Sequence, residues 1–194
     1  NIIGDAFIIS GYDIRSTLRV LFKSDFFKDA RFAKVKSPAE VVVGTMNLVG
    51  DFKGVPKPGL YAIGGEPANM GQDLLNPPSV EGWHTGAEWI DSGSLVRRIN
   101  FVADRVGDIS LPGVRDIVSR VRSQGTMTPE QLVESCLDLI GPVQVNDSTH
   151  QELVAHARRS GEVLWDAEET SDTSTRRVTE MLQLIVSSRE YQFG

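Results

Sequence analysis

The sequence predicts an all-α fold, an irregular helical bundle of about seven or eight helices with one long Trp/Pro-rich loop packed on it. Apolar residues recur at intervals of three and four along most of the chain, as on one face of an amphipathic helix. Good N-cap residues and first-turn prolines precede several of these stretches, and both mark helix N-termini. Strand signals are nearly absent, because the apolar runs at 2–3 and 143–145 are too short to carry a sheet.

The first thirty residues predict one amphipathic helix over 13–25, with Asp13 as its N-cap. Residues 1–12 form a lead-in to it. We expect the apolar side chains on either side of this helix to be buried, namely Ile8, Ile9, Phe26 and Phe27.

A second helix is predicted over 38–49. Ser37 and Glu40 have the spacing of a capping box, and Pro38 occupies the first helical position. The helix is apolar on most sides and stops at Gly50. It should therefore be a central, buried helix.

A weaker helix is predicted over 59–73, where Gly64 and Gly65 interrupt the pattern. The stretch 70–97 that follows is dense in Gly and Pro, so much of it cannot form regular structure. It contains Trp83 and Trp89, and a buried Trp removes a large apolar area from water. We expect both to hold the Trp loop, residues 74–92, against the neighbouring helices.

The remaining helices follow clearer signals. Asp91 or Ser92 caps the helix that ends at Gly107, and Thr128 with Gln131 forms a capping box. Ser148 with Gln151 repeats that spacing, and 167–174 reads as a mobile, acidic loop. The predicted helices are 93–106, 112–123, 129–140, 148–159 and 174–189.

The length of 194 residues suits one domain. We expect a single helical domain over 1–194, with a motif-rich core over 1–109 that includes the Trp loop and a helical extension over 110–194. The chain begins at Asn1 within sequence of folded character. It is therefore expected to be a C-terminal fragment of a longer protein.

Charge and apolar content exclude some functions. The net charge of −6 and the isoelectric point of about 5.1 argue against a nucleic-acid partner, which normally requires a basic face. No apolar run approaches the roughly 20 residues of a transmembrane helix. The single cysteine, Cys136, excludes an internal disulfide and lies among apolar residues of a predicted helix, as a core thiol would.

The stretch 70–97 carries the residues that could form a binding site. Aromatic faces beside carboxylates and amides are what a sugar-binding cleft needs, and glycoside hydrolysis needs two carboxylates roughly 5 to 9.5 Å apart. The alternative is that the Trp residues anchor the loop, the amides satisfy backbone groups and the acids face water. The candidates are Gln72, Asn76, Glu81, Trp83, His84, Glu88, Trp89, Asp91 and Arg97.

No metal or cofactor is expected. Glu81 and His84 could supply two metal ligands, but a three-histidine site would also need His150 and His156, whose spacing of six does not place them on one helix face. Gly64-Gly65 lacks the following Lys-Ser/Thr of a phosphate loop. Lys34 and Lys36 precede a helix N-terminus, where an anion could bind, although a solvated turn with a structural ion pair explains them more simply.

Several motifs follow one another in a fixed order along the chain. They are Lys34-Val35-Lys36-Ser37-Pro38-x-Glu40, Met70-Gly71-Gln72, Asn76-Pro77-Pro78-x-Val80-x-Gly82-Trp83, Trp89-Ile90, Leu95, Arg97-x-x-Asn100 and Ser188-Arg189-Glu190-Tyr191-Gln192. Together they resemble the C-terminal part of a large bacterial family known as domain of unknown function eighteen hundred. The resemblance covers 10–194, although 108–186 matches only in its helical pattern. Two positions depart from the family pattern: Ser79 stands where Asn is usual and Arg189 where Pro is usual.

The resemblance implies no established activity. It implies a protein more than twice this length, often exported, encoded near a sulfatase-like gene and associated with the cell envelope. We expect a non-enzymatic helical module that binds a protein or polysaccharide partner. The alternative is part of an envelope hydrolase that acts on a polysaccharide through the Trp loop. An enzyme should place at least two of the polar candidates in one concave pocket, whereas a binding module should scatter them.

Overall fold

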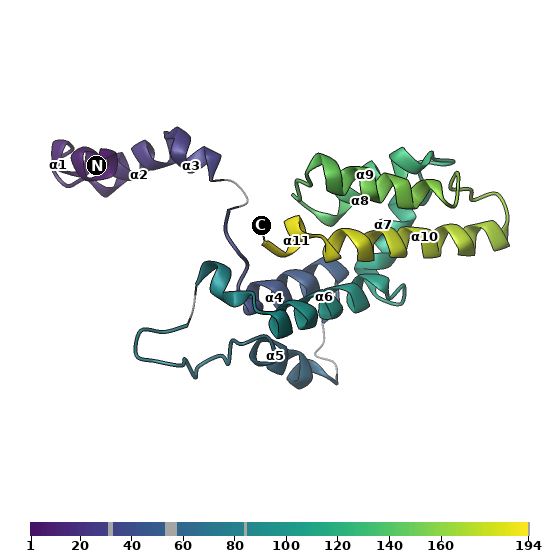
Figure 1. The fold of residues 1–194 in the computed structure, drawn as a ribbon, viewed down its shortest axis with the longest axis horizontal. Coiled ribbons are helices and arrows are strands. Elements are labelled where there is room, and N and C mark those ends of the chain that lie inside the picture. Colours follow the sequence, from purple (N-terminus) through teal and green to yellow (C-terminus); the bar gives the residue numbers. More distant parts are fainter. Residues whose placement is uncertain (31–32, 53–57, 84, 194) are drawn as a thin grey trace. The chain divides into compact units, whose positions relative to one another are not determined.

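The computed structural model describes residues 1–30, 33–52, 58–83 and 85–193. This part of the chain contains eleven α-helices, one short 3-10 helix and no strand (Figure 1), which confirms the all-α fold class. Extended pairing is limited there to the isolated bridges Ser79–Gly82 and Met127–Val163.

The helices have the following bounds, most of them within a few residues of those predicted. They are α1 Ile2–Ile9, α2 Ile14–Lys23, α3 Asp25–Asp29, α4 Pro38–Val49, α5 Leu60–Asn69, the 3-10 helix η1 Gly86–Trp89, α6 Ser92–Gly107, α7 Pro112–Arg122, α8 Pro129–Ile140, α9 Asp147–Arg158, α10 Glu168–Ser187 and α11 Arg189–Phe193.

The chain divides into two compact units, residues 1–34 and 35–194. The first unit contains α1, α2 and α3, and none of these helices has a buried residue. The second unit contains the whole hydrophobic core, which draws on α4 and α6 as well as on α7 to α10. Helices on both sides of residue 109 therefore share one core. The single domain expected over 1–194 stays a prediction.

Helix α10 is the central element of the second unit. It packs against α6, α7, α8, α9 and α11, while α4 packs against α5, α6 and α7 (Figure 1). Helices α4 and α7 meet at Gly113, where a Cβ atom would clash with the carbonyl oxygen of Leu48 and the backbone of Val49. The missing side chain at Gly113 thus allows the two backbones to come into direct contact.

The N-terminus of α4 forms as predicted. Ser37 Oγ accepts a hydrogen bond from the Glu40 amide at 3.4 Å, and Glu40 Oε2 accepts one from the Ser37 amide at 2.8 Å. Pro38 follows as the first helical residue and Gly50 closes the helix in a left-handed conformation. Because the buried face includes Val41, Val42 and Val49, α4 is the expected core helix, although Val43 on its other side is exposed.

Ser37→Ala should lower the free energy of unfolding by about 1 kcal/mol, because the Glu40 amide loses its acceptor. Chemical denaturation measures the change. Ser187→Ala is a matched control, since the Ser187 hydroxyl is exposed and bonds only to a carbonyl of its own helix. Equal midpoints for Ser37→Ala and the unaltered chain would rule out the stabilising cap.

The expectations for the N-terminal residues are wrong in two respects. Residues 2–9 form α1 rather than an irregular lead-in, with Asn1 as the N-cap. The four apolar side chains expected to be buried are all exposed, with Ile9 at 85% exposure. A three-helix unit of about 30 residues is too small to enclose them. They are Ile8, Ile9, Phe26 and Phe27.

Two predictions in the last third of the chain are wrong, and one short helix there was not predicted. The N-cap of α9 is Asn146, whose Oδ1 accepts from the Thr149 amide at 2.8 Å, so the predicted Ser148–Gln151 capping box is wrong. The acidic stretch expected as a loop over 167–174 is the first turns of α10. Residues 189–193 add the short helix α11, which the apolar pattern does not indicate.

Candidate functional site

The Trp loop leaves the helices and returns to them. Figure 1 shows the connection between α5 and α6 running far out before it re-enters the helical body at η1. Side chains over 74–81 are exposed, and Leu75 is 96% exposed with a positive φ of 69°. The expectation that the whole loop packs on the body is therefore wrong for this outer half.

The inner half of the loop is anchored. Trp89, the last residue of η1, is only 6% exposed, and its carbonyl oxygen accepts a hydrogen bond from Ser94 Oγ at 2.9 Å. Trp83 is half-buried, and its indole Nε1 is enclosed without a hydrogen-bond partner. The predicted burial is thus confirmed for Trp89 and only partial for Trp83.

Two candidate carboxylates serve as helix caps. Asp91 Oδ1 accepts from the amides of Gly93 at 2.8 Å and Ser94 at 2.9 Å, at the N-terminus of α6. These backbone hydrogen bonds lower the pKa of the Asp91 carboxyl. Glu88 Oε2 accepts from the Thr85 amide at 3.3 Å and closes the turn of η1. Both groups act within their own local structure.

The amide side chains of Gln72 and Asn76 also have partners. Gln72 is buried, and its Oε1 accepts from the Ala39 amide at 2.9 Å, which satisfies a free donor in the first turn of α4. Asn76 Nδ2 donates to Asp73 at 2.9 Å within the loop.

Arg97 links α6 to α5. It donates through Nε and Nη2 to the two carboxylate oxygens of Glu66, at 3.2 and 3.1 Å. This two-bond pairing holds both side chains in one plane. Arg97 thus has a structural partner that sequence spacing does not reveal.

Among the described residues, the polar candidates bond to separate partners. Glu81 is exposed, and His84 lies outside the described residues. Two pockets formed by described residues lie elsewhere, one on α2 and the other between α9 and the α10–α11 junction. The second has a volume of about 560 Å³ and is lined by Glu152, His156 and Arg189, among others. Neither contains a residue of the Trp loop.

A buried arginine that the sequence analysis missed lies at the junction of three segments. Arg98 on α6 is 0% exposed, and its Nη2 donates to the carbonyl oxygens of Lys36 at 2.9 Å and Gln192 at 3.2 Å. Nη1 is enclosed without a hydrogen-bond partner. Burial lowers the pKa of this guanidinium. Arg98 thereby connects both the segment before α4 and the C-terminal helix α11 to α6.

Lys36 lies beside Arg98 in what we call the Arg98 cluster, which consists of Lys36, Arg98, Tyr191 and Gln192. Lys36 Nζ donates to the Tyr191 carbonyl oxygen at 3.2 Å and sits 4.4 Å from the centre of the Tyr191 ring. Burial, and then the positive charge of Arg98, lower the pKa of Lys36. Burial raises the pKa of Tyr191. Lys36 is therefore not part of a solvated turn.

Residues 190 and 192, close to the C-terminal end of the chain, form hydrogen bonds with other helices of the second unit. Gln192 Nε2 donates to the Val186 carbonyl oxygen at 2.7 Å and holds α11 against α10. Glu190 Oε1 accepts from Asn146 Nδ2 at 2.6 Å and from Thr149 Oγ1 at 3.1 Å, at the start of α9. Gln192 and Glu190 thus connect the C-terminal residues to α10 and to the start of α9.

Cys136 is buried in the core, as expected, and burial raises the pKa of its thiol to about 12. The neutral thiol is the form present at ordinary pH, and a thiolate is needed for nucleophilic attack. The core position therefore protects Cys136 from reagents.

Cys136 in the folded chain should react with a thiol reagent only as fast as the protein unfolds, because the thiol is both enclosed and protonated. Labelling followed by mass spectrometry measures the rate. A Val43→Cys substitution in a Cys136→Ala background should label at once, since position 43 is exposed. Between pH 9 and 12 stability should fall as pH rises, because the unfolded chain loses the thiol proton first. Rapid labelling of native Cys136 would contradict the burial.

The described residues contain neither a metal-binding cluster nor a membrane-spanning helix. No group there brings together three or more His, Cys, Asp or Glu side chains that could hold a metal ion. His150 instead lies with its Nε2 2.7 Å from Glu134 Oε1. Within the same ranges, no helix has the length and apolarity needed to cross a membrane.

Comparison with known proteins gives one match. A family model described as "Protein of unknown function (DUF1800)" matches residues 2–193, including the stretch over 108–186 that carries few motifs. No curated protein and no solved structure matches the chain.

Proposed function

Since the chain belongs to the family described as protein of unknown function DUF1800, over residues 2–193, we propose a function from its own geometry. It is a non-enzymatic helical module of a larger, exported bacterial protein, and it binds a partner protein through the outer half of the Trp loop. The observation that carries this proposal is the exposed, apolar loop segment over 74–81, which is held at its base by the core.

The first support is the chemistry of the loop surface. Leu75 and Val80 are almost fully exposed, and Leu74 is about half exposed. Exposed apolar side chains cost free energy in water, at roughly 25 cal/mol for each Å² that could be buried. Binding residues commonly lie on loops held by a rigid scaffold, and clustered exposed apolar side chains mark interaction sites. A partner that covers this segment would bury them.

The second support is the rigid base of the loop. Trp89 and the Asp91 cap fix one end on α6, and Gln72 fixes the other end on α4. Pro77 and Pro78 stiffen the segment between them. A loop that is stiff and anchored loses less entropy when it binds.

The third support is that three polar candidates of the stretch 70–97 make structural contacts. Asp91 and Glu88 cap helices, and Arg97 pairs with Glu66. These contacts are those of a scaffold. The alternative remains part of an envelope hydrolase, in which the Trp loop contributes carboxylates to a site completed by other segments, and Glu81 is the residue to test.

Photo-crosslinking from the loop tests the proposal. A benzophenone amino acid at position 79, in the protein expressed in its source cells, should give discrete adducts with one partner protein. The double variant Leu75→Ser/Val80→Ser should abolish them, because it removes the two most exposed apolar side chains. Benzophenone at position 43, which is also exposed and apolar but lies on α4, should give no such adduct.

The outcome that would contradict the proposal is enzymatic. If the protein cleaves purified cell-wall polysaccharide and Glu81→Gln abolishes cleavage while folding is unchanged, the hydrolase alternative replaces it. If the crosslinks persist in the double serine variant, the exposed apolar side chains of the loop do not form the interface, and the proposal is also contradicted.

A further inference from the structure

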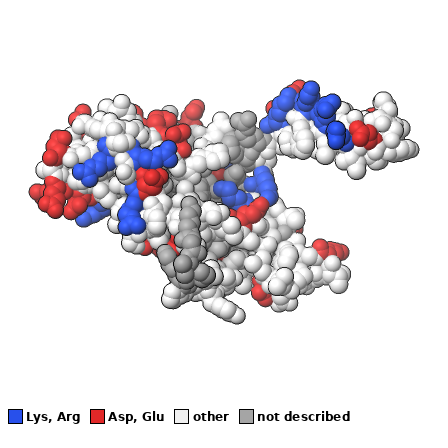
Figure 2. Space-filling model, turned by 180° about the vertical axis from the view of Figure 1, so that it is seen from behind, with Lys and Arg blue, Asp and Glu red and all other residues white. Residues whose placement is uncertain are grey.

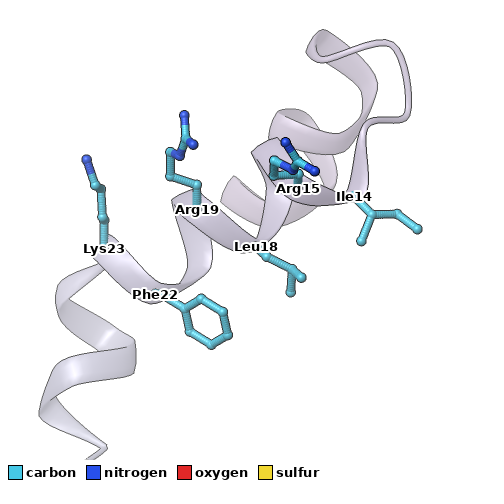
Figure 3. A pocket seen from close by; sticks show the side chains of 6 residues that line it. All are labelled: Ile14, Arg15, Leu18, Arg19, Phe22 and Lys23. Carbon is cyan, nitrogen blue, oxygen red and sulfur yellow. The ribbon is translucent and has the colours of Figure 1, made fainter.

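Helix α2 is amphipathic, and its apolar row is exposed to solvent rather than buried in the core. Figure 3 shows Ile14, Leu18 and Phe22 pointing to one side of α2, while Arg15, Arg19 and Lys23 point to the other. The apolar row is exposed over its whole length. Each set recurs every four residues, so each forms a row along the 10-residue helix.

In the described residues, Arg15, Arg19 and Lys23 have no carboxylate partner within 4 Å. The nearby ion pair joins two other residues, Lys28 and Asp25 of α3. Figure 2 shows Lys and Arg side chains gathered in a row on this unit. Residues 1–34 hold six Lys and Arg against four Asp and Glu, a net charge of +2. Residues 35–194 hold fourteen against twenty-two, a net charge of −8. The net charge is therefore positive in the first unit and negative in the second.

We propose that α2 binds the surface of an anionic membrane, with Ile14, Leu18 and Phe22 inserted among the acyl chains and Arg15, Arg19 and Lys23 on the lipid headgroups. A helix with a strong apolar face, a basic polar face and low overall hydrophobicity lies in the plane of a membrane surface. The long basic side chains reach outward to the headgroups while their stems lie along the apolar boundary. The charge complementarity selects anionic lipid as the occupant. This surface is separate from the Trp loop.

Neighbouring residues extend the same apolar surface. Phe27 contacts Phe22 edge to face with ring centres 5.1 Å apart, and both rings are exposed. Phe is one of the residues that such helices insert below the headgroups. The aromatic pair would deepen the insertion at the C-terminal end of α2.

The test is co-sedimentation of the full chain with sucrose-loaded vesicles. Vesicles of equal parts phosphatidylglycerol and phosphatidylcholine should bind the chain, and vesicles of phosphatidylcholine alone should bind it far more weakly. Arg15→Gln/Arg19→Gln/Lys23→Gln should lower the partition coefficient by roughly 100-fold, because each basic residue near an anionic surface contributes about fivefold. Leu18→Ser/Phe22→Ser should also lower it, by removal of inserted apolar groups.

A matched control removes three charges elsewhere. Arg115→Gln/Arg120→Gln/Arg176→Gln changes exposed residues of α7 and α10 and should leave vesicle binding within twofold. Circular dichroism confirms that every variant keeps its helices. The proposal is overturned if the unaltered chain does not bind, if it binds both vesicle types equally, or if the control loses as much binding as the α2 variant. It is also overturned if Leu18→Ser/Phe22→Ser abolishes a dimer in solution while vesicle binding is unchanged, since a second copy then covers the face.

Discussion

Trp89→Ala should lower the free energy of unfolding by about 3 to 5 kcal/mol, as other large-to-small changes in cores do. The indole is 6% exposed and lies directly before α6, with its carbonyl oxygen bonded to Ser94 Oγ. Its removal leaves a cavity and frees the base of the Trp loop, which is ordered at a cost of roughly 1 to 2 kcal/mol per residue. Urea denaturation followed by circular dichroism measures the change.

Trp83→Ala is the matched control for this prediction. The Trp83 side chain is only half-buried, so its loss should cost less than the loss of Trp89. If Trp89→Ala leaves stability intact, the indole does not anchor the loop, and the interpretation of the Trp loop as a sugar-binding cleft gains support.

Arg98→Ala should lower the free energy of unfolding by about 3 kcal/mol. The substitution leaves the buried carbonyl oxygens of Lys36 and Gln192 without their donor, at roughly 1 to 3 kcal/mol for each unsatisfied group. Removal of a buried charge offsets part of this cost. The loss should free α11, so amide hydrogen exchange over 189–193 should accelerate along with the fall in stability.

Arg98→Met separates the two opposing effects, because it keeps the aliphatic stem but has neither the charge nor the donors. Since both carbonyl oxygens stay unsatisfied, we expect Arg98→Met to remain less stable than the unaltered chain. Should Arg98→Met prove as stable or more stable, the desolvation of the guanidinium outweighs its hydrogen bonds, as happens for some buried ion pairs.

The helices that could be predicted are those whose start signals are local. The capping boxes at Ser37 and Thr128 involve residues three apart, and both form as predicted. Asn146 and Ser148 are both good caps for α9, and the sequence alone favours the wrong one. Glu190 decides between them, because it bonds to Asn146 from 44 residues away. No local pattern carries that contact.

The candidate site was harder to predict for the same reason. Gln72 and Arg97 belong to recognisable motifs, but their partners Ala39 and Glu66 lie about 30 residues away. Arg98 escaped prediction because a charged residue was not expected in a core. Its position four residues after Ser94 and four before Val102 places it on the buried face of α6, and this spacing is the signal that could have found it.

The central position of α10 has a consequence for the synthesis of the protein. The helices α6, α7, α8 and α9 are translated before α10, yet each of them packs against it. A nascent chain that ends before residue 168 therefore exposes the apolar faces of four finished helices. At a synthesis rate of roughly 5 to 20 residues per second, these faces remain exposed for several seconds, until α10 and α11 have been translated. During that interval the growing chain is a natural client for a chaperone, and a ribosome that stalls there would yield an aggregation-prone product.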